Sequence, residues 1–469
     1  MCIRDRVVTL CLAVGCAPTQ PPSPEPVPTP LPRSKPLPTP VEGLEDERLG
    51  VAWASSFYAD GNWPNIVWAM DVGMTWDRWP FERAWIPKNE EGFDFNWSDN
   101  HISYDNAVSG DDNILNILAV INGPPQIPLD LVDWEEYVDA IVTNYKDDVA
   151  AWEIGNEWGL PNHPDLSSAD YLDILRVTCD VLYKHSQDNK PILLGSPLPY
   201  IWEEDSWEAV IEGIHSDDVY NERYGTLPNC LDAIGVHAYD QPSRSRDEII
   251  IAYQKSHVDN WNPGVWITEN GVRWRQVPEA SEEAYSNKYR QASYVIQQFV
   301  LALIGYEEIG IDTLEPNRAK IFYHRFSDAA EGAPPQEIPW GLVSPHRDSR
   351  YPAYNAMGLL TSLLAGASSP EKMPHSENIS HYLFRKDGKL IHIIWANNYK
   401  IPNLHIRAQG TQPEHCATLY YQPGNGDYSP ESEANDPEND GSFWELPGFP
   451  MASLGAVSYT HLRAHETVL

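Results

Sequence analysis

From residue 49 onward, short apolar runs alternate with longer stretches in which apolar residues recur at helical spacing. Parallel strands joined by crossover helices produce this alternation, so the eight runs predict a (β/α)8 barrel over residues 42–365. Several runs end in Arg, Glu, His or Asn, which predicts a polar rim at the C-terminal strand ends. The runs are residues 49–54, 74–78, 114–121, 151–157, 192–196, 233–239, 265–270 and 320–324.

The stretch between the fourth and fifth runs illustrates the predicted helices. Ser168 can cap its start, and Pro191 limits its end. Outside the N-terminal segment, the cysteines Cys179, Cys230 and Cys416 form an odd set without metal-ligand spacing. We expect buried free thiols, with a Cys179–Cys230 bridge as the alternative. The buried face of the helix should comprise Tyr171, Leu172, Leu175, Cys179 and Leu182.

Beyond residue 364 the apolar period changes to two. Runs at residues 381–385 and 389–395 flank Lys386-Asp387-Gly388, which is a hairpin signal. We therefore expect residues 366–456 to form a small antiparallel β-sandwich domain. Its acidic segment, residues 429–440, lacks the spacing of a calcium loop, so we expect a solvated loop, with calcium binding as the alternative. Further strand-like runs are residues 404–408, 417–422 and 442–446.

The two ends of the chain share one DNA origin. Residues 1–6 and 457–461 can be encoded by opposite strands of a single tag that resembles a transposon adapter used in sequencing libraries. We therefore assign residues 1–6 and 457–469 to adapter sequence and exclude them from fold prediction.

Residues 7–16 form an apolar run that is too short to span a bilayer and looks like a truncated export signal. Its end, Ala13-Val14-Gly15-Cys16, is similar to a bacterial lipoprotein cleavage box, which would leave Cys16 as the acylated first residue. Ordinary secretion is the alternative. Residues 17–41 are rich in Pro and poor in apolar side chains, which is typical of an extended linker. We expect an extracellular or cell-surface protein.

The formal net charge of −36 argues against nucleic acid or an anionic membrane surface as a partner, because both would be repelled. We expect membrane contact only through a lipid on Cys16. We also expect no metal or other cofactor, and a monomer.

The fourth run contains Trp152-Glu153-Ile154-Gly155-Asn156-Glu157. Strand alternation would point Glu153, Gly155 and Glu157 into the barrel, with Glu157 at the rim. A carboxyl there can act as a general acid if its surroundings favour the protonated form. The alternative for Glu157 is an ordinary rim ion pair, and Glu153 suits a buried cation such as Arg78.

The seventh run repeats this pattern, and alternation would point Val265, Ile267 and Glu269 inward. Two glutamates then meet at one barrel mouth. Hydrolysis of a glycosidic bond needs one carboxyl to protonate the leaving oxygen and another to meet the oxocarbenium-like carbon. This pair predicts glycosidase chemistry.

Both motifs resemble those on the fourth and seventh strands of clan A glycoside hydrolases, which are retaining enzymes on a TIM barrel. Residues 73–78 and Gly235-Val236-His237-Ala238-Tyr239 are similar to the clan's second and sixth strands. The likeness covers nearly the whole barrel and is best to families 39 and 5. Trp158 departs from the pattern, because Pro usually follows the acid/base glutamate, and this puts the local loop in doubt.

The resemblance implies a role for each matching residue. Glu157 would be the acid/base and Glu269 the nucleophile, while Asn156 would bind the sugar 2-hydroxyl. Arg78 and Tyr239 would hydrogen-bond the Glu269 carboxylate. The likeness also implies that His237 shapes the subsite, although a lone His at a strand end is as often structural. Separately, Trp340 is our candidate for a flat platform under a sugar ring.

The sequence therefore predicts a retaining glycoside hydrolase that acts on O-glycosidic, β-linked bonds of an extracellular oligo- or polysaccharide. Two alternatives use the same groove. One is a non-catalytic carbohydrate-binding surface lipoprotein, and the other is a transglycosylase that passes the sugar to a second sugar.

Overall fold

The computed structural model divides the chain into two compact units, Met1–Pro36 and Leu37–Leu469, and all described residues belong to the second. The predicted adapter segment at residues 1–6, the signal with Cys16, the linker, Cys416 and the acidic segment 429–440 lie outside them. The structure describes residues 46–54, 64–90, 92–95, 115–123, 129–157, 166–185, 192–195, 205–216, 230–257, 261–273, 282–328, 340–344, 349–368, 370–373, 379–387, 389–396, 405–406, 417–420, 444–445 and 457–461.

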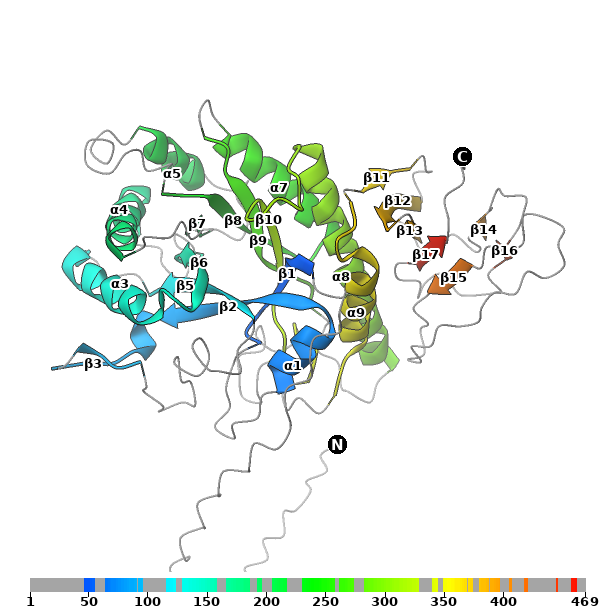
Figure 1. Ribbon diagram of the computed structural model, residues 1–469, viewed down its shortest axis with the longest axis horizontal. Coiled ribbons are helices and arrows are strands. Elements are labelled where there is room, and N and C mark those ends of the chain that lie inside the picture. Colours follow the sequence, from blue (N-terminus) through cyan, green and yellow to red (C-terminus); the bar gives the residue numbers. More distant parts are fainter. Residues whose placement is uncertain are drawn as a thin grey trace, which may run out of the picture. The chain divides into compact units, whose positions relative to one another are not determined.

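Eight parallel strands close into a barrel in the order β1-β10-β9-β8-β7-β6-β5-β2, with helices outside (Figure 1). All eight runs predicted from the sequence are strands. Their bounds are β1 Asp46–Ala52, β2 Met74–Glu82, β5 Asn116–Asn122, β6 Val149–Ile154, β7 Ile192–Leu194, β8 Ala233–Tyr239, β9 Gly264–Gly271 and β10 Ala319–Tyr323. The helices are α1 Pro64–Asp71, α3 Leu131–Tyr145, α4 Ser168–His185, α5 Asp205–His215, α7 Pro242–Ser256, α8 Glu282–Glu308 and α9 Pro352–Leu364. After β2 come the 3-10 turn η1 Arg83–Trp85 and a small pair, β3 Lys88–Asn89 and β4 Gly92–Phe93.

The start of α4 corrects one detail of the prediction. Ser168 is the first helical residue, and the capping residue is Ser167. The Ser167 hydroxyl accepts a hydrogen bond from the Asp170 backbone N–H at 3.2 Å, and the Asp170 carboxylate accepts one from the Ser167 N–H at 2.9 Å. This reciprocal pair is a capping box. The predicted apolar face of α4 is buried as expected.

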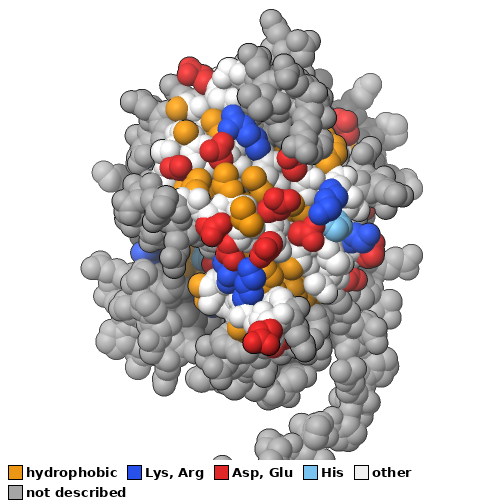
Figure 2. All heavy atoms as spheres, turned by 90° about the vertical axis from the view of Figure 1, so that its left-hand side faces the viewer, with side chains coloured by type: hydrophobic (Ala, Val, Ile, Leu, Met, Phe, Trp, Pro, Cys, Tyr) orange, Lys and Arg blue, Asp and Glu red, His pale blue; other side chains and the backbone are white. Residues whose placement is uncertain are grey.

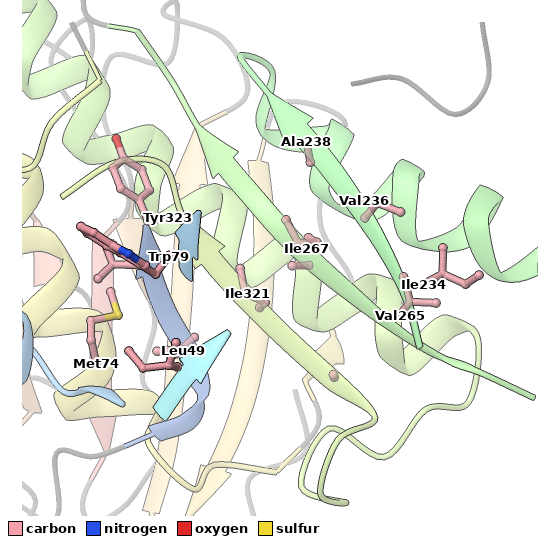
Figure 3. Packing of buried hydrophobic residues seen from close by; sticks show 14 of the residues in the cluster. Leu49, Met74, Trp79, Ile234, Val236, Ala238, Val265, Ile267, Ile321 and Tyr323 are labelled. Carbon is pink, nitrogen blue, oxygen red and sulfur yellow. The ribbon is translucent and has the colours of Figure 1, made fainter. Parts of the chain in front are cut away.

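Strand alternation divides the core into two parts. Trp76, Trp266 and Phe322 fill the barrel interior together with three smaller residues. Residues on the other side of the strands, such as Ile234 and Val236, pack towards the helix layer (Figure 3). The described residues of the barrel interior therefore form a packed core, and in this fold the ligand site is expected at the C-terminal end of the strands.

After α9 the chain forms antiparallel sheets, as predicted. Strands β12 Ile379–Lys386 and β13 Lys389–Ala396 make the expected hairpin in a sheet of order β11-β12-β13-β17-β15. Strand β17, Val457–His461, lies between β13 and β15 and comes from the segment that we assign to adapter sequence. Alternating residues such as Val-Ser-Tyr-Thr pair with an open sheet edge whatever their origin. The remaining strands are β11 Glu371–Lys372, β14 His405–Ile406, β15 Ala417–Tyr420 and β16 Trp444–Glu445.

Cys179 and Cys230 form a disulfide bond, with their Cα atoms 6.1 Å apart. Our expectation of free thiols at these two positions was wrong. The two residues are 51 positions apart, and only the packing of α4 beside the segment before β8 brings them together. Cysteine spacing in the sequence carries no information about that contact.

On the face over α3 and α4, basic and acidic side chains are interleaved (Figure 2). Lys184 and His185 lie 2.9 and 2.7 Å from Asp139, and Lys88 bridges to Asp133 and Glu136. Within the part of the chain that the structure describes, no helix is long and apolar enough to cross a membrane.

Candidate active site

Arg78 organises the C-terminal end of the barrel. It lies on β2, it is buried, and its guanidinium donates to three different residues. Nε donates to Glu153 at 2.5 Å, Nη1 donates to Glu269 at 2.5 Å, and Nη2 donates to the Asn156 side-chain oxygen at 2.7 Å. The predicted hydrogen bonds from Arg78 to Glu153 and Glu269 are thus present. Because Asn156 accepts through its oxygen, its amide nitrogen remains a donor.

Glu157 reaches the mouth by a route that strand alternation did not predict. Strand β6 ends at Ile154, and Gly155 and Glu157 both have positive φ values, of 82° and 53°. A non-glycine residue in this left-handed region is uncommon and often marks a functional site. The turned backbone places the Glu157 side chain, which is 19% exposed, within 2.8 Å of His237 Nδ1.

Glu269 also requires a correction to the alternation argument. Val265 and Ile267 face the helix layer, and Trp266 lies inside the barrel, so the predicted inward set was wrong for these positions. The register between β8 and β9 then shifts, because Val236 pairs with Ile267 and His237 pairs with Glu269. One extra residue on β9, Thr268, resets the phase, as a β-bulge does. Glu269 consequently points inward, whereas strict alternation from the outward-facing Ile267 would have pointed it towards the helix layer.

Three cationic or ionisable groups surround the Glu269 carboxylate. Arg78 holds Oε1, while His237 Nδ1 and His324 Nδ1 each lie 3.7 Å from Oε2. Burial raises the pKa of Glu269, but His237, His324 and Arg78 together lower it further, to about 2. Glu269 is therefore ionised at ordinary pH, as a nucleophile must be.

His237 links the two glutamates. Burial lowers its pKa, but Glu269 and the hydrogen bond to Glu157 raise it by more, so that the net shift is upward. One ligand atom each from Glu157, His237 and Glu269 lies within 4.8 Å of the others. Such a donor set could hold a metal ion, but His237 and Arg78 already bind the two carboxylates.

Tyr239 and Trp340 lie beside this cluster and pack against each other. Among the described residues, no hydrogen bond joins Tyr239 to Glu269. The Tyr239 ring packs instead against Trp340, with centroids 4.9 Å apart. Trp340 is only 5% exposed, and the Arg273 guanidinium lies 4.7 Å from its ring centroid. A ring covered in this way is a poor flat platform for a sugar.

His324 is the site residue that the sequence argument missed. It directly follows β10, and its ring packs edge-on against Tyr239 and Trp340. Burial lowers the pKa of His324 to about 4, and neighbouring cations add to this against the opposing effect of Glu269. Alternation along β10 would have found His324 once Phe322, two positions earlier, was known to lie inside the barrel.

Comparisons with known proteins show the fold. No family model matches the chain, and no curated protein matches it. A family 39 glycoside hydrolase from Bacteroides cellulosilyticus WH2 is similar in structure over 91% of this chain and 83% of its own, with 16% identity and a TM-score of 0.61.

Two further solved structures are similar. A family 51 alpha-L-arabinofuranosidase from Bifidobacterium longum has 12% identity, covers 89% of this chain and 97% of its own, and has a TM-score of 0.54. A GH30 endoxylanase from Clostridium papyrosolvens C71 has 13% identity, covers 90% of this chain and 97% of its own, and has a TM-score of 0.51. These likenesses confirm the predicted resemblance to the clan A fold. At such identities they establish the fold alone.

Proposed function

We propose that the chain is a retaining glycoside hydrolase that cleaves β-linked O-glycosidic bonds of an extracellular oligo- or polysaccharide. One observation carries the proposal: a carboxylate oxygen of Glu157 and one of Glu269 lie within 4.8 Å of each other, on either side of His237. Retaining enzymes hold their two carboxyl groups ~5–5.5 Å apart, whereas inverting enzymes need ~6.5–9.5 Å to admit a water.

We assign different tasks to the two carboxyl groups, and their surroundings support the assignment. Glu269 is ionised and fixed by Arg78 through Oε1, so its oxygen can attack the anomeric carbon. As the carbon–oxygen bond to the leaving group breaks, Glu157 gives its proton to the leaving oxygen and a glycosyl ester forms on Glu269. Glu157 then removes a proton from water, which attacks the anomeric carbon and releases Glu269. Asn156 is placed to donate to a hydroxyl of the bound sugar.

Export to the cell surface is part of the same proposal. The lipoprotein-like segment ending in Cys16 and the Pro-rich linker suit a tethered enzyme. The Cys179–Cys230 disulfide adds support, because such bonds persist in oxidising compartments. Mass spectrometry of the protein made in its native host should detect a lipid on Cys16, and an uncleaved, unacylated Cys16 would reject the anchor.

The purified protein should be assayed on aryl β-glycosides and polysaccharides. Xylan belongs in the panel because one structural neighbour is an endoxylanase. Proton NMR of the first-formed sugar should show the anomeric configuration of the substrate. A first product of opposite configuration would reject the mechanism, and elongated products would indicate transglycosylation. Absence of turnover on the whole panel would favour the carbohydrate-binding alternative.

Two variants separate the roles of the glutamates. Glu269→Gly should lose turnover and recover it with azide, which gives a glycosyl azide of inverted configuration. Glu157→Ala should still cleave substrates whose leaving group needs no proton, and azide should give a product of retained configuration. Identical behaviour of the two variants would contradict these assignments.

A further inference from the structure

His324 has two ring nitrogens in different surroundings. Nδ1 is buried, lies 3.7 Å from Glu269 Oε2, and has no hydrogen-bond partner. Nε2 also has no hydrogen-bond partner in the described part of the chain, and because the side chain is 19% exposed while Nδ1 is buried, the exposed part of the ring lies away from Nδ1. The imidazole therefore reaches from the carboxylate to the open mouth of the barrel.

The protonation of this ring follows from its neighbours. A neutral imidazole has one N–H donor and one acceptor nitrogen, and a carboxylate only accepts. Because Glu269 is ionised and lies next to Nδ1, the proton of a neutral His324 is most stable on Nδ1. The exposed Nε2 is then an acceptor. The downward pKa shift of His324 agrees with a neutral ring at ordinary pH.

The other side chains that contact Glu269 cannot supply this acceptor. Arg78 only donates, and His237 is 1% exposed and already bonded to Glu157 through Nδ1. A sugar hydroxyl can donate as well as accept, so a site that fixes it benefits from one partner of each kind.

We propose that His324 is a specificity-determining residue whose Nε2 accepts a hydrogen bond from one hydroxyl group of the sugar bound at Glu269. The inference rests on the proposed function. It means that the enzyme selects a sugar by the hydroxyl that faces β10. It also means that the same imidazole couples recognition of that hydroxyl to the nucleophile through Nδ1.

The test combines variants of His324 with a series of monodeoxy sugars. The wild-type protein should discriminate against one deoxy analogue by roughly tenfold to a hundredfold in kcat/KM, because that analogue leaves Nε2 unpaired. His324→Phe keeps a ring to pack on Tyr239 but has no acceptor. In this variant the parent sugar and that analogue should react at similar rates, while the other deoxy analogues keep their wild-type ratios.

Two controls complete the design. His324→Gln restores an acceptor oxygen near the Nε2 position and should recover part of the discrimination. His257→Phe changes an exposed histidine that stacks on Tyr253 away from the site, and should leave every ratio unchanged.

The inference is overturned if His324→Phe retains the full discrimination against every deoxy analogue. It is also overturned if the variant lowers the ratios of all analogues equally, because that pattern indicates a general structural role. If the wild-type protein turns over none of the sugars, the proposed function fails. In that case calorimetry gives the dissociation constants of the same sugars for the wild-type protein and for His324→Phe. The ratio of these constants between the parent sugar and each deoxy analogue then tests the inference.

Discussion

Replacing Arg78 by Met should destabilise the fold more than the loss of an ordinary ion pair does. The change removes the shared partner of Glu153 and Glu269, which are 0% and 6% exposed. Leaving a buried charge without its partner costs about 3–5 kcal/mol. A second value for the free energy comes from the pKa of Glu269, which is lowered from 4.5 to about 2. That shift corresponds to about 3 kcal/mol at neutral pH, shared among Arg78, His237 and His324.

The dependence of the free energy of unfolding on pH gives a sharper test, because the lowered pKa of Glu269 fixes the direction of the change. Glu269 has a lower pKa in the folded protein, so its stabilisation is complete above pH ~4.5 and is lost as the pH falls towards 2. In Arg78→Met the folded-state pKa of Glu269 should rise. The difference in free energy of unfolding between wild type and variant should therefore be largest at pH 7 and should shrink below pH ~4.5.

The measurement is urea unfolding followed by tryptophan fluorescence at pH 7, 4 and 3. Arg385→Met serves as the control, since Arg385 and Glu371 form an ion pair of 3.5 Å with side chains 58% and 61% exposed. An exposed pair of this kind contributes at most about 1 kcal/mol. The reasoning is refuted if both variants lose the same free energy at pH 7, or if the loss in Arg78→Met does not change with pH.

Three further predictions follow from the fold. Burial raises the pKa of Asp328 to about 7 against hydrogen bonds from Gly341 and Tyr351, so wild-type stability should fall as the pH rises from ~4 to ~7. Asp328→Asn should remove this fall and give the higher Tm at pH 8, and an unchanged Tm profile would contradict it. Reducing the Cys179–Cys230 bond, or replacing both cysteines by Ser, should lower the free energy of unfolding by about 2–4 kcal/mol, and a reductant should then have no effect on the double variant. Deleting residues 366–456 should lower the Tm of the barrel, because Phe384 and other side chains of the hairpin belong to the barrel's own core cluster, and an unchanged Tm would refute this.

The sequence was sufficient for the barrel strands because their signal is local. Each strand is a short apolar run between turns, and the polar ends identified Glu157 and Glu269 without knowledge of their neighbours, while the family resemblance supplied His237. The inward orientation of Glu269 was predicted by alternation with Ile267, which in fact faces the helix layer. The bulge at Thr268 restores the inward orientation, and it depends on pairing with β8. Register shifts of this kind arise between strands, so no single strand predicts them.

Features set by distant contacts escaped prediction. The disulfide depends on α4 packing beside a segment 51 positions later. Trp340 lies beside the site, but the Tyr239 ring packs against it at a tilt and the Arg273 guanidinium lies over its ring. His324 would have been found by extending the inward alternation of β10 by two positions, which requires knowing that Phe322 lies inside the barrel.

The closure of the barrel has a consequence for the order of events during synthesis. Strand β1 pairs with β2 on one side and with β10 on the other, where Leu49 is in register with Ile321. At a ribosomal rate of about 5–20 residues per second, the edge of β1 stays unpaired for roughly 15–55 seconds, until about 270 more residues have been added. The hydrogen bonds that the Arg48 guanidinium donates to the Leu364 and Ala367 carbonyls form later still, because these residues lie 316 and 319 positions further along the chain. During that interval the nascent chain presents an open parallel edge, which makes it a substrate for whatever chaperone or export machinery binds unfolded chains.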